Sequence, residues 1–357
     1  MRLMKIKMLD KLYHPIYSFY RGKPYDFSTL ENQEIFLSYA DTFNDKFEGS
    51  VFVDCKEFEE QYLHNFVGDC YFQELSSKFK FCKDISILDE IFIHTDVNGL
   101  SIPNDMSMGI KELLIHTDWK KFKNRLEKTY QKYLCEIDKV RKSFGIKCFT
   151  VIPPETNSIM WAYYGNNYKG FCCNFSLGKI VYDLPSSRCD EYGKFIYEHF
   201  EKVKYKDNFA PSIKIDCFKL LEIPIDKIKC SPYILDAVKK SLAIKQSQWK
   251  HEKEIRLIIK DDENIEIAER TKHGFKIRFP YLSEISYCCK KSHPFLSEEK
   301  GESKKHEHVK ILAKRLNLIC KRLTPSREKK IFNVEQVFPY PPKGIAYDYS
   351  PDDELPF

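Results

Sequence analysis

The sequence predicts an α+β protein, in which a strand-rich body carries a helical insertion at about residues 55–145. Short runs rich in aromatic and β-branched residues lie on both sides of the insertion, as is typical of strands. Inside the insertion apolar residues recur at spacings of three and four, as on one face of a helix. With 43% hydrophobic and 31% charged residues, the composition is that of a globular protein. We therefore expect one domain over residues 1–325 and a proline-rich extended tail over residues 326–357.

The first elements are predicted from residues 14–50. HPIYSFYRG at residues 14–22 predicts an aromatic strand. Ser28, with Glu31 three residues later, has the pattern of a capping box that begins a helix. EIFLSYA predicts a strand at residues 34–40, and residues 41–50 a polar loop.

The insertion is predicted from one long amphipathic pattern, which Gly145 is expected to end. Its apolar face consists of Phe122, Leu126, Tyr130, Tyr133, Ile137 and Val140.

After the insertion the pattern is rich in strands. Residues 156–165 predict a short helix, with Asn157 or Ser158 as its N-cap and Gly165 as its end. The further predicted strands are residues 146–152, 169–176, 199–205, 252–260, 275–280 and 283–289, and the further helices are residues 236–246 and 306–317.

Composition excludes several classes of protein. No apolar run approaches the roughly 18 residues of a membrane span, and Lys5, Lys7 and Asp10 argue against a secretory signal peptide. Fifty-eight Lys and Arg against 52 Asp and Glu give a net charge of +6. We interpret the densest basic stretch, near Lys321–Lys330, as a solvated surface, so composition does not predict a nucleic-acid-binding protein.

The 13 cysteines do not have the spacing of a metal site or of a disulfide framework. The adjacent pairs Cys172-Cys173 and Cys288-Cys289 point to opposite faces if they lie on strands. Cys148, in an apolar run, is expected to behave as a small hydrophobic residue. We therefore expect free, mostly buried thiols, no metal, and a reducing cytoplasmic location.

Four segments place polar residues inside aromatic or apolar frames. They are Tyr20-Arg21-Gly22; Phe43 to Gly49, with Asn44, Asp45 and Glu48; Met160 to Gly165, with Trp161, Tyr163 and Tyr164, followed by Lys169-Gly170-Phe171; and Trp249 to Arg256.

The fourth segment is the most informative. If residues 252–260 form a strand, Glu252, Glu254 and Arg256 share one face at intervals of roughly 6.5 to 7 Å. That face is either a solvated outer surface or a row of carboxylates in a cleft, oriented by the arginine. The loop Phe43 to Gly49 also has two interpretations: a turn anchored by its phenylalanines, or a loop whose Asp45 or Glu48 reaches the active cleft.

These four segments, in this order, resemble the bacterial family named domain of unknown function 2971. The resemblance consists of a tyrosine/arginine strand, an F-N-D-x-F-E-G loop, a tryptophan-tyrosine helix before a strand, and W-x-x-E-x-E-x-R. It spans most of residues 13–260. Residues 55–144 and the proline-rich tail lie outside it.

A looser resemblance is to ADP-ribosyltransferase-like folds, and it implies a split sheet. It implies that Arg21, beside Tyr20, holds the ribose or phosphate of NAD, and that Tyr163 or Tyr164, in the element of Trp161, stacks on nicotinamide. Glu254 or Glu252 would then bond a ribose hydroxyl and stabilise the oxocarbenium-like transition state. A Ser-Thr-Ser element is absent, because Ser28-Thr29 comes too early, so an arginine-tyrosine-glutamate arrangement is implied.

The resulting hypothesis is an NAD-dependent ADP-ribosyltransferase-like enzyme that modifies a macromolecule, protein or nucleic acid, as a toxin, effector or phage-defence component. NAD is its substrate, and neither a metal nor a membrane is expected. One alternative is a metal-dependent nuclease that uses Asp45, Glu48, Glu252 and Glu254 as oxygen ligands. The other is a non-catalytic interaction module whose aromatic clefts bind a partner.

Overall fold

The computed structural model describes residues 15–43, 49–75, 95–96, 99–100, 118–176, 191–207, 213–263, 265–289, 304–326 and 331–338. The chain forms two compact units. Unit 1 comprises Met1–Thr42, Gly145–Asp207 and Lys245–Phe357, and unit 2 comprises Phe43–Phe144 and Asn208–Ile244. Helices combined with a large mixed sheet confirm the α+β class.

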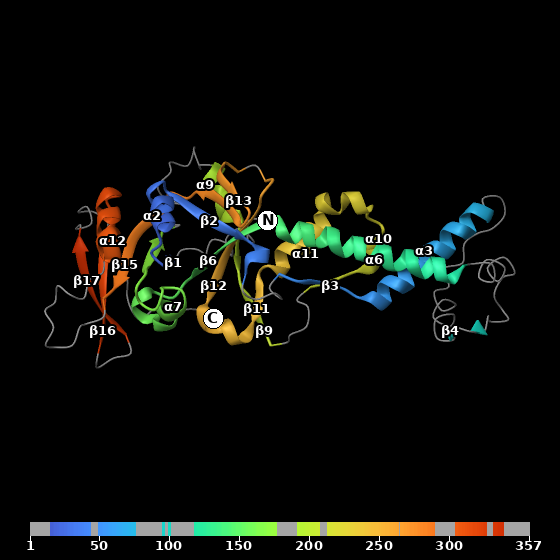
Figure 1. Ribbon diagram of the computed structural model, residues 1–357, viewed down its shortest axis with the longest axis horizontal. Coiled ribbons are helices and arrows are strands. Elements are labelled where there is room, and N and C mark those ends of the chain that lie inside the picture. The colour runs from blue at the N-terminus through green and yellow to red at the C-terminus, as the bar shows by residue number, and fades with distance from the viewer. Residues whose placement is uncertain are drawn as a thin grey trace, which may run out of the picture. The chain divides into compact units, whose positions relative to one another are not determined.

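Unit 1 is built on an 11-stranded sheet, whose strands are drawn as arrows in Figure 1. Nine strands follow the order β13-β14-β2-β6-β1-β7-β15-β16-β17, while β12 pairs with β6 and with β8. The strands are β1 (Ile16–Tyr20), β2 (Glu34–Tyr39), β6 (Phe144–Thr150), β7 (Phe171–Phe175), β8 (Phe200–Lys202), β12 (Glu254–Lys260), β13 (Ile267–Thr271), β14 (Gly274–Arg278), β15 (Leu282–Cys288), β16 (Ile319–Pro325) and β17 (Phe332–Phe338).

Short helices and a small second sheet complete unit 1. β9 (Lys204–Lys206) and β11 (Ile244–Gln246) pair with each other, apart from the large sheet. The helical elements are α2 (Pro24–Glu31), η1 (Ala40–Thr42), η2 (Pro154–Thr156), α7 (Ser158–Tyr163), α9 (Glu191–Glu198), η4 (Ser247–Glu252) and α12 (Lys304–Arg315).

The two faces of the sheet carry different cores, because successive strand residues point to opposite faces. Cys173 joins a large core with Phe149, Phe175 and Phe279, whereas Cys172 joins a smaller core around Trp161. Cys288 and Cys289 divide between the same two cores. The prediction that adjacent cysteines face opposite ways is therefore confirmed.

The structure differs from the prediction of an extended tail over residues 326–357. β17 pairs with β16 along its length, with Leu323 opposite Val334, and Phe332 lies 6.5 Å from the Trp161 ring between centroids. Residues 332–338 contain Phe332, Val334, Val337 and Phe338, residue types that favour strands, and the dense prolines at residues 339–342 obscured this signal. Residues 339–357 lie outside the described ranges.

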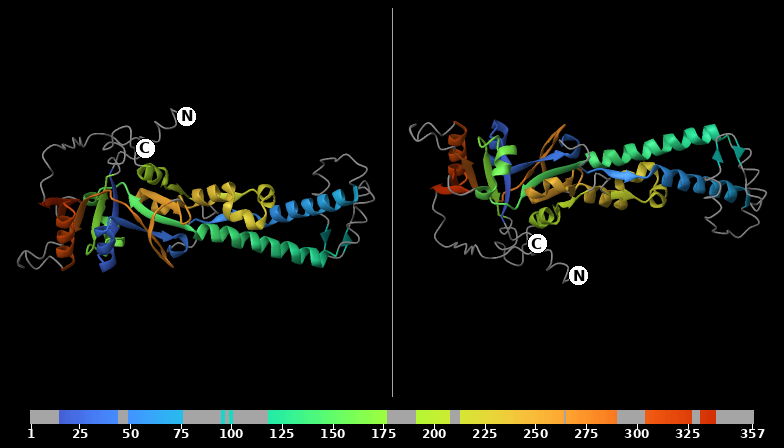
Figure 2. Two further views of the ribbon diagram at one scale, coloured as in Figure 1. Left: turned by 90° about the horizontal axis from the view of Figure 1, so that it is seen from above. Right: turned by 90° about the horizontal axis from the view of Figure 1, so that it is seen from below.

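Unit 2 contains two long helices, α3 (Cys55–Leu75) and α6 (Trp119–Lys142), which run side by side in Figure 2. Phe58 contacts the rings of Tyr130 and Tyr133, while Phe66 contacts Phe122, so the two helices are antiparallel. The other elements are β3 (Val51–Val53), β4 (Thr95–Asp96), β5 (Gly99–Leu100), β10 (Ile213–Ile215), α10 (Cys217–Leu221), η3 (Ile225–Cys230) and α11 (Pro232–Ser241).

The insertion therefore differs from the single segment at about residues 55–145. Unit 2 combines that segment with residues 208–244, which the sequence had assigned to the strand-rich body. Val53 pairs with Ile215 in a parallel ladder between β3 and β10, and Tyr133 donates a hydrogen bond to the carbonyl of Ile223 at 2.9 Å. The predicted apolar face of α6 is confirmed, because Leu126, Tyr133, Ile137 and Val140 are buried.

Two predicted helix ends were wrong. Ser28 lies inside α2, whose N-cap is Lys23 with Pro24 at the first helical position. Gly145 does not end the insertion helix, because α6 ends at Lys142 and Gly145 lies in β6. Asn157 does cap α7, since its side chain accepts a hydrogen bond from the Met160 amide at 3.2 Å.

Across the described ranges, no helix combines the length and the apolar character needed to cross a bilayer.

Candidate functional site

Four charged side chains of unit 1, one of them a lysine, form one network of ion pairs. Lys245 lies in β11, Glu252 ends η4, and Glu254 and Arg256 begin β12. Lys245 Nζ lies 2.5 Å from Glu252 Oε2 and 3.0 Å from Glu254 Oε2. Arg256 donates to both oxygens of Glu254, at 2.8 and 3.2 Å. We call these four residues the glutamate cluster.

The glutamate cluster is buried, with Glu252 2%, Glu254 4% and Arg256 0% exposed. The interpretation of this strand face as a solvated outer surface was therefore wrong. β12 lies between β6 and β8, so neighbouring strands flank it on both sides. Two cations balance two anions, as a buried site of low dielectric requires.

The backbone between the two glutamates is not a regular strand. Lys253 has a φ of 43°, in the left-handed region, and it separates the 3-10 helix η4 from β12. Glu252 therefore precedes the strand, although the sequence predicted it within the strand. The Thr150 hydroxyl donates to the Glu252 carbonyl at 2.6 Å, and the Val151 amide donates to the Lys253 carbonyl at 3.3 Å. These bonds attach the turn to the end of β6.

Two tyrosines contact the glutamate cluster. The Tyr164 hydroxyl, just after α7, donates to Glu252 Oε1 at 2.8 Å, and burial followed by the nearby Glu252 raises the pKa of Tyr164. The Tyr205 hydroxyl accepts a hydrogen bond from the Glu254 amide at 2.8 Å, and its pKa is raised to about 12, mainly by burial. Both phenols are therefore protonated at neutral pH.

Burial and charge act in opposite directions on the ionisable groups of the cluster. Desolvation raises the pKa of Glu254, and the ammonium of Lys245 opposes that shift. Burial lowers the pKa of Lys245, but Glu254 and Glu252 outweigh it, so the pKa of Lys245 is raised. Lys245 is therefore an ammonium ion at neutral pH, and it lies between the side chains of Glu252 and Glu254.

Cys148 reaches the cluster from β6. Cys148 is exposed. Desolvation, followed by the negative charge of Glu254, raises the pKa of the Cys148 thiol well above its ordinary value. The expectation of a buried, small hydrophobic cysteine was wrong here. Solvent reaches the side of the cluster that Cys148 borders.

Tyr163, which ends α7, and Tyr164, which follows it, differ in exposure. Tyr164 touches Glu252, whereas Tyr163 is 63% exposed. Tyr163 lines a shallow depression of about 360 Å³ together with Ser158, Ile159, Ala162, Tyr168 and His251. Trp161 is fully buried, and its indole N–H donates to the Pro154 carbonyl at 2.8 Å. Trp161 is therefore a core residue and not a cofactor-binding one.

Tyr20 is the last residue of β1, and Arg21 follows it outside the strand. Tyr20 lies in the large core together with Ile255 and Leu257, which point away from Glu254 on β12. Tyr20 was therefore wrongly assigned to the same site as Glu254. Arg21 is exposed at the end of β1, and its carbonyl accepts a hydrogen bond from the Asn166 side chain at 3.4 Å. Its role in binding NAD stays a prediction.

Asn44, Asp45 and Glu48, the polar residues of the predicted F-N-D-x-F-E-G loop, lie outside the described residues.

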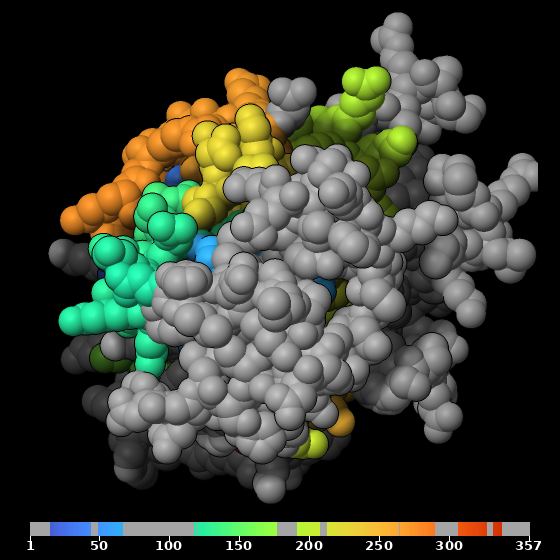
Figure 3. Space-filling view, turned by 90° about the vertical axis from the view of Figure 1, so that its right-hand side faces the viewer, coloured from blue at the N-terminus to red at the C-terminus, as the bar shows by residue number. Residues whose placement is uncertain are grey.

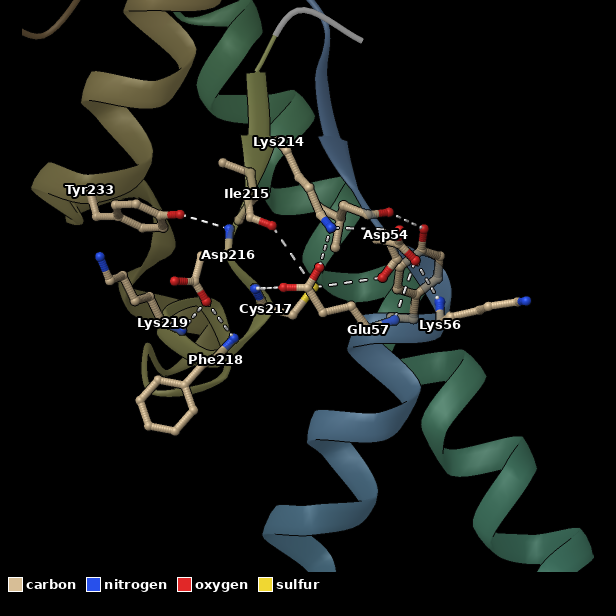
Figure 4. A network of polar contacts seen from close by, with 12 residues as sticks. Asp54, Lys56, Glu57, Lys214, Ile215, Asp216, Cys217, Phe218, Lys219 and Tyr233 are labelled. Carbon is tan, nitrogen blue, oxygen red and sulfur yellow. Dashed lines mark hydrogen bonds and ion pairs between the residues drawn. The ribbon is translucent and has the colours of Figure 1, made fainter. Parts of the chain in front are cut away.

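Unit 2 has its own polar network where α3 and α10 begin, drawn in Figure 4. Asp54 accepts hydrogen bonds from the first amides of α3, and Asp216 does the same for α10. Lys214 Nζ lies 2.5 Å from Glu57, which also accepts from the Cys217 amide at 3.4 Å. These contacts attach β10 to the start of α3. Asp54 and Asp216 therefore act as helix caps, and Glu57 as an ion-pair partner of Lys214. Within the described residues, neither unit groups three His, Cys, Asp or Glu side chains that could hold a metal ion.

Sequence reasoning missed Lys245 and Cys148. Lys245 is a lone basic residue in the apolar run SLAIKQ, which is a weak signal of a buried ion pair. The sequence around Cys148 contains no pattern that predicts a contact with Glu254, because that contact depends on how β6 and β12 pair.

Comparison with known proteins places a family match over this site. Residues 160–257 match the family described as Protein of unknown function (DUF2971). The match runs from α7 to β12 and contains Tyr164, Lys245 and the W-x-x-E-x-E-x-R segment, so the predicted resemblance to this family is confirmed over these residues. No curated protein and no solved structure matches the chain.

Proposed function

We propose that the chain is an NAD-consuming transferase of the ADP-ribosyltransferase-like kind, with the glutamate cluster as its acidic site. The observation that carries the proposal is the pair Glu252 and Glu254 held together at the start of a sheet strand by Lys245. Buried ion pairs are costly to form, and an unusual cluster of them is a frequent feature of functional sites.

In the proposed reaction the bond between the nicotinamide nitrogen and ribose C1′ breaks. Nicotinamide leaves with the bonding electron pair, and positive charge develops on the ribose. Glu254 would stabilise this charge, because a fixed carboxylate in a dry site stabilises a cation more strongly than water does. A nucleophile of the macromolecular acceptor then attacks C1′ and loses a proton.

The surrounding residues support an orienting role. Lys245 and Arg256 hold the Glu254 carboxylate by donors at 2.8 to 3.2 Å, so its position is fixed before substrate arrives. Tyr164 holds Glu252 in the same way. Tyr163, with its exposed ring one residue earlier, supplies a flat surface on which a nicotinamide or adenine ring could stack. Such an enzyme would act as a toxin, effector or phage-defence component in the cytoplasm.

The metal-dependent nuclease is not proposed. Lys245 Nζ occupies the space between the two carboxylates at 2.5 and 3.0 Å, where a divalent cation would have to bind. An ammonium ion there competes directly with a metal ion for the same oxygens.

A second candidate function is the non-catalytic interaction module. Its support is the depression beside α7, at which Tyr163 and Ile159 are 63% and 44% exposed. Exposed aromatic and aliphatic side chains around a hollow are typical of sites that bind a partner.

The test is nicotinamide release from NAD by the purified chain, with and without a cell extract as the source of acceptors. Glu254→Gln keeps the size of the side chain and removes its charge, so release should fall about 100- to 1,000-fold. Glu252→Gln is the matched control, because only one of the two carboxylates is expected to reach the ribose. Circular dichroism verifies folding of both variants. Absence of turnover by the wild type with extract present would contradict the transferase and favour the interaction module.

A further inference from the structure

Helix α6 has a surplus of positive charge as large as the net charge of the whole chain. It has nine Lys and Arg but three Asp and Glu, a surplus of six. The chain as a whole has 58 and 52, so the residues outside α6 contain 49 of each sign. α6 is therefore one of two strongly basic segments; the other, residues 304–330, has ten Lys and Arg and two Asp and Glu, and it spans α12, β16 and the residues after β16 rather than one helix. The basic residues of α6 are Lys120, Lys121, Lys123, Arg125, Lys128, Lys132, Lys139, Arg141 and Lys142.

Five of these cations form a line along one helix face. Successive members are four, three, four and seven residues apart, which are the spacings that bring side chains to the same face. The line extends over about 27 Å, at 1.5 Å per residue. All five side chains are exposed. We call this line the basic stripe: Lys121, Arg125, Lys128, Lys132 and Lys139.

The basic stripe lies away from the side of α6 that packs in unit 2. The buried residues of α6 are Leu126, Tyr133, Ile137 and Val140, which follow their own spacing of seven, four and three. The side chains of α6 stand at the surface in Figure 3. Packing within unit 2 therefore leaves the stripe in contact with solvent.

Few acidic groups neutralise the stripe. Lys121 pairs with Asp118 at 3.0 Å, and Lys139 pairs with Glu136 at 2.6 Å, at its two ends. Arg125, Lys128 and Lys132, in the middle, have no ion-pair partner among the residues that the structure describes. Like charges four residues apart repel one another and destabilise a helix. A polyanion placed along the stripe would remove this repulsion.

We propose that the basic stripe binds the phosphate backbone of a nucleic-acid duplex. A straight helix about 27 Å long matches a rigid rod with a regular phosphate spacing. Proteins that bind single strands add exposed aromatic rings on which bases stack. The aromatic side chains that the structure describes in α6, Phe122, Tyr130 and Tyr133, belong to the packed side instead. The inference does not depend on the NAD chemistry proposed above.

The size of the effect follows from release of counterions. Five neutralised phosphates give a slope of about −4.5 for log K against log salt, so affinity falls roughly 500-fold between about 50 and 200 mM salt. Removing the three central charges leaves about two phosphates and a slope of about −1.8, which corresponds to roughly a 12-fold change.

The experiment measures fluorescence anisotropy of a labelled DNA duplex of about 20 base pairs over this salt range. The variant is Arg125→Gln, Lys128→Gln and Lys132→Gln together, since Gln keeps helix propensity and removes charge. The matched control removes the same charge from α9, η3 and the turn before β14, at exposed residues Lys194, Lys229 and Lys272. The control should bind with the wild-type salt slope, and the α6 variant with a much shallower one.

Three results would overturn the proposal: no binding of the duplex by the wild type at about 50 mM salt, equal salt slopes for the two triple variants, or stronger capture by phosphatidylserine vesicles than by the duplex.

Peptide-resolved alkylation gives a second measurement that needs no variant. The duplex should protect Cys135, which is exposed on α6 between Lys132 and Lys139, and leave exposed Cys230 of η3 unprotected. Equal alkylation of Cys135 with and without duplex would contradict the assigned face. Nicotinamide release from NAD alone should be unchanged in the α6 variant, so this proposal and the transferase fail separately.

Discussion

Replacing Lys245 by methionine tests whether the glutamate cluster is the buried network described here. Its Nζ lies 2.5 and 3.0 Å from two carboxylates, and the three side chains are 10%, 2% and 5% exposed. Removing one member of a buried ion pair leaves an uncompensated charge, which costs about 3–5 kcal/mol. We expect Lys245→Met to lower the free energy of unfolding by that amount. Urea denaturation at neutral pH measures it.

The matched control lies in the same unit. Lys276 Nζ is 2.6 Å from Glu269, a carboxylate that is 52% exposed, so Lys276→Met should cost no more than about 1 kcal/mol. The two variants make the same chemical change at a similar distance from a carboxylate. They differ mainly in the burial of the partner.

The dependence on pH gives a second criterion. Without Lys245, desolvation raises the folded-state pKa of Glu254 further above its unfolded value. A carboxyl group whose pKa is raised by folding destabilises the folded state when it is ionised, and this cost disappears as pH falls through the raised pKa. The deficit of Lys245→Met should therefore be largest at neutral pH and shrink on acidification. A deficit equal to that of Lys276→Met at every pH would refute the buried network.

Two further predictions concern the C-terminal strand and the exposed thiol. Deleting residues 327–357 removes β17 and the contact of Phe332 with Trp161, so the melting temperature should fall, with about 3–5 kcal/mol of stability lost from Phe332 alone. The control deletes only residues 339–357. Equal melting temperatures of the two deletion variants would show that β17 contributes nothing. The negative charge of Glu254 raises the pKa of the Cys148 thiol, so Glu254→Gln should lower that pKa. Iodoacetamide should then alkylate Cys148 faster in the variant at neutral pH, as measured by peptide mass. An unchanged rate would contradict the contact between Glu254 and Cys148.

Alternation along a strand was the most reliable guide in the sequence. It correctly separated Ile255, Leu257 and Ile259, which lie in the large core, from Glu254 and Arg256. It could not show that the polar face is also buried. That depends on Lys245 and Tyr164, which contact the two glutamates from other parts of the chain.

The same rule, applied to the aromatic strand β1, separates Ile16 and Tyr20, which lie in the large core, from Tyr17, which lies in the smaller core around Trp161. The position of Lys245 beside Glu254 cannot be predicted in this way. β11 and β12 are joined by a 3-10 helix, and the spacing of apolar residues does not predict the path of that helix. The extent of unit 2 was missed for a similar reason. Its second segment, residues 208–244, joins α3 and α6 through contacts far apart in sequence, such as Tyr133 with Ile223.

The C-terminal strand was missed because composition was given more weight than pattern. FNVEQVF at residues 332–338 is a strand sequence, but the prolines that follow it favoured an extended tail. A strand at the edge of a sheet needs one partner only, and β16 supplies it.

The most direct test of the central claim, that NAD binds at the glutamate cluster, is protection of Cys148 from alkylation. Cys148 is exposed in unit 1 beside Glu254, whereas Cys230 is exposed in unit 2. Both rates can be followed in one sample by peptide mass, with increasing NAD and with adenosine as a control ligand. We predict that NAD at about ten times its dissociation constant slows alkylation of Cys148 about tenfold and leaves Cys230 unchanged, since only the protein without ligand reacts. An unchanged rate at Cys148, or equal slowing at both cysteines, would contradict the assignment of NAD to this site.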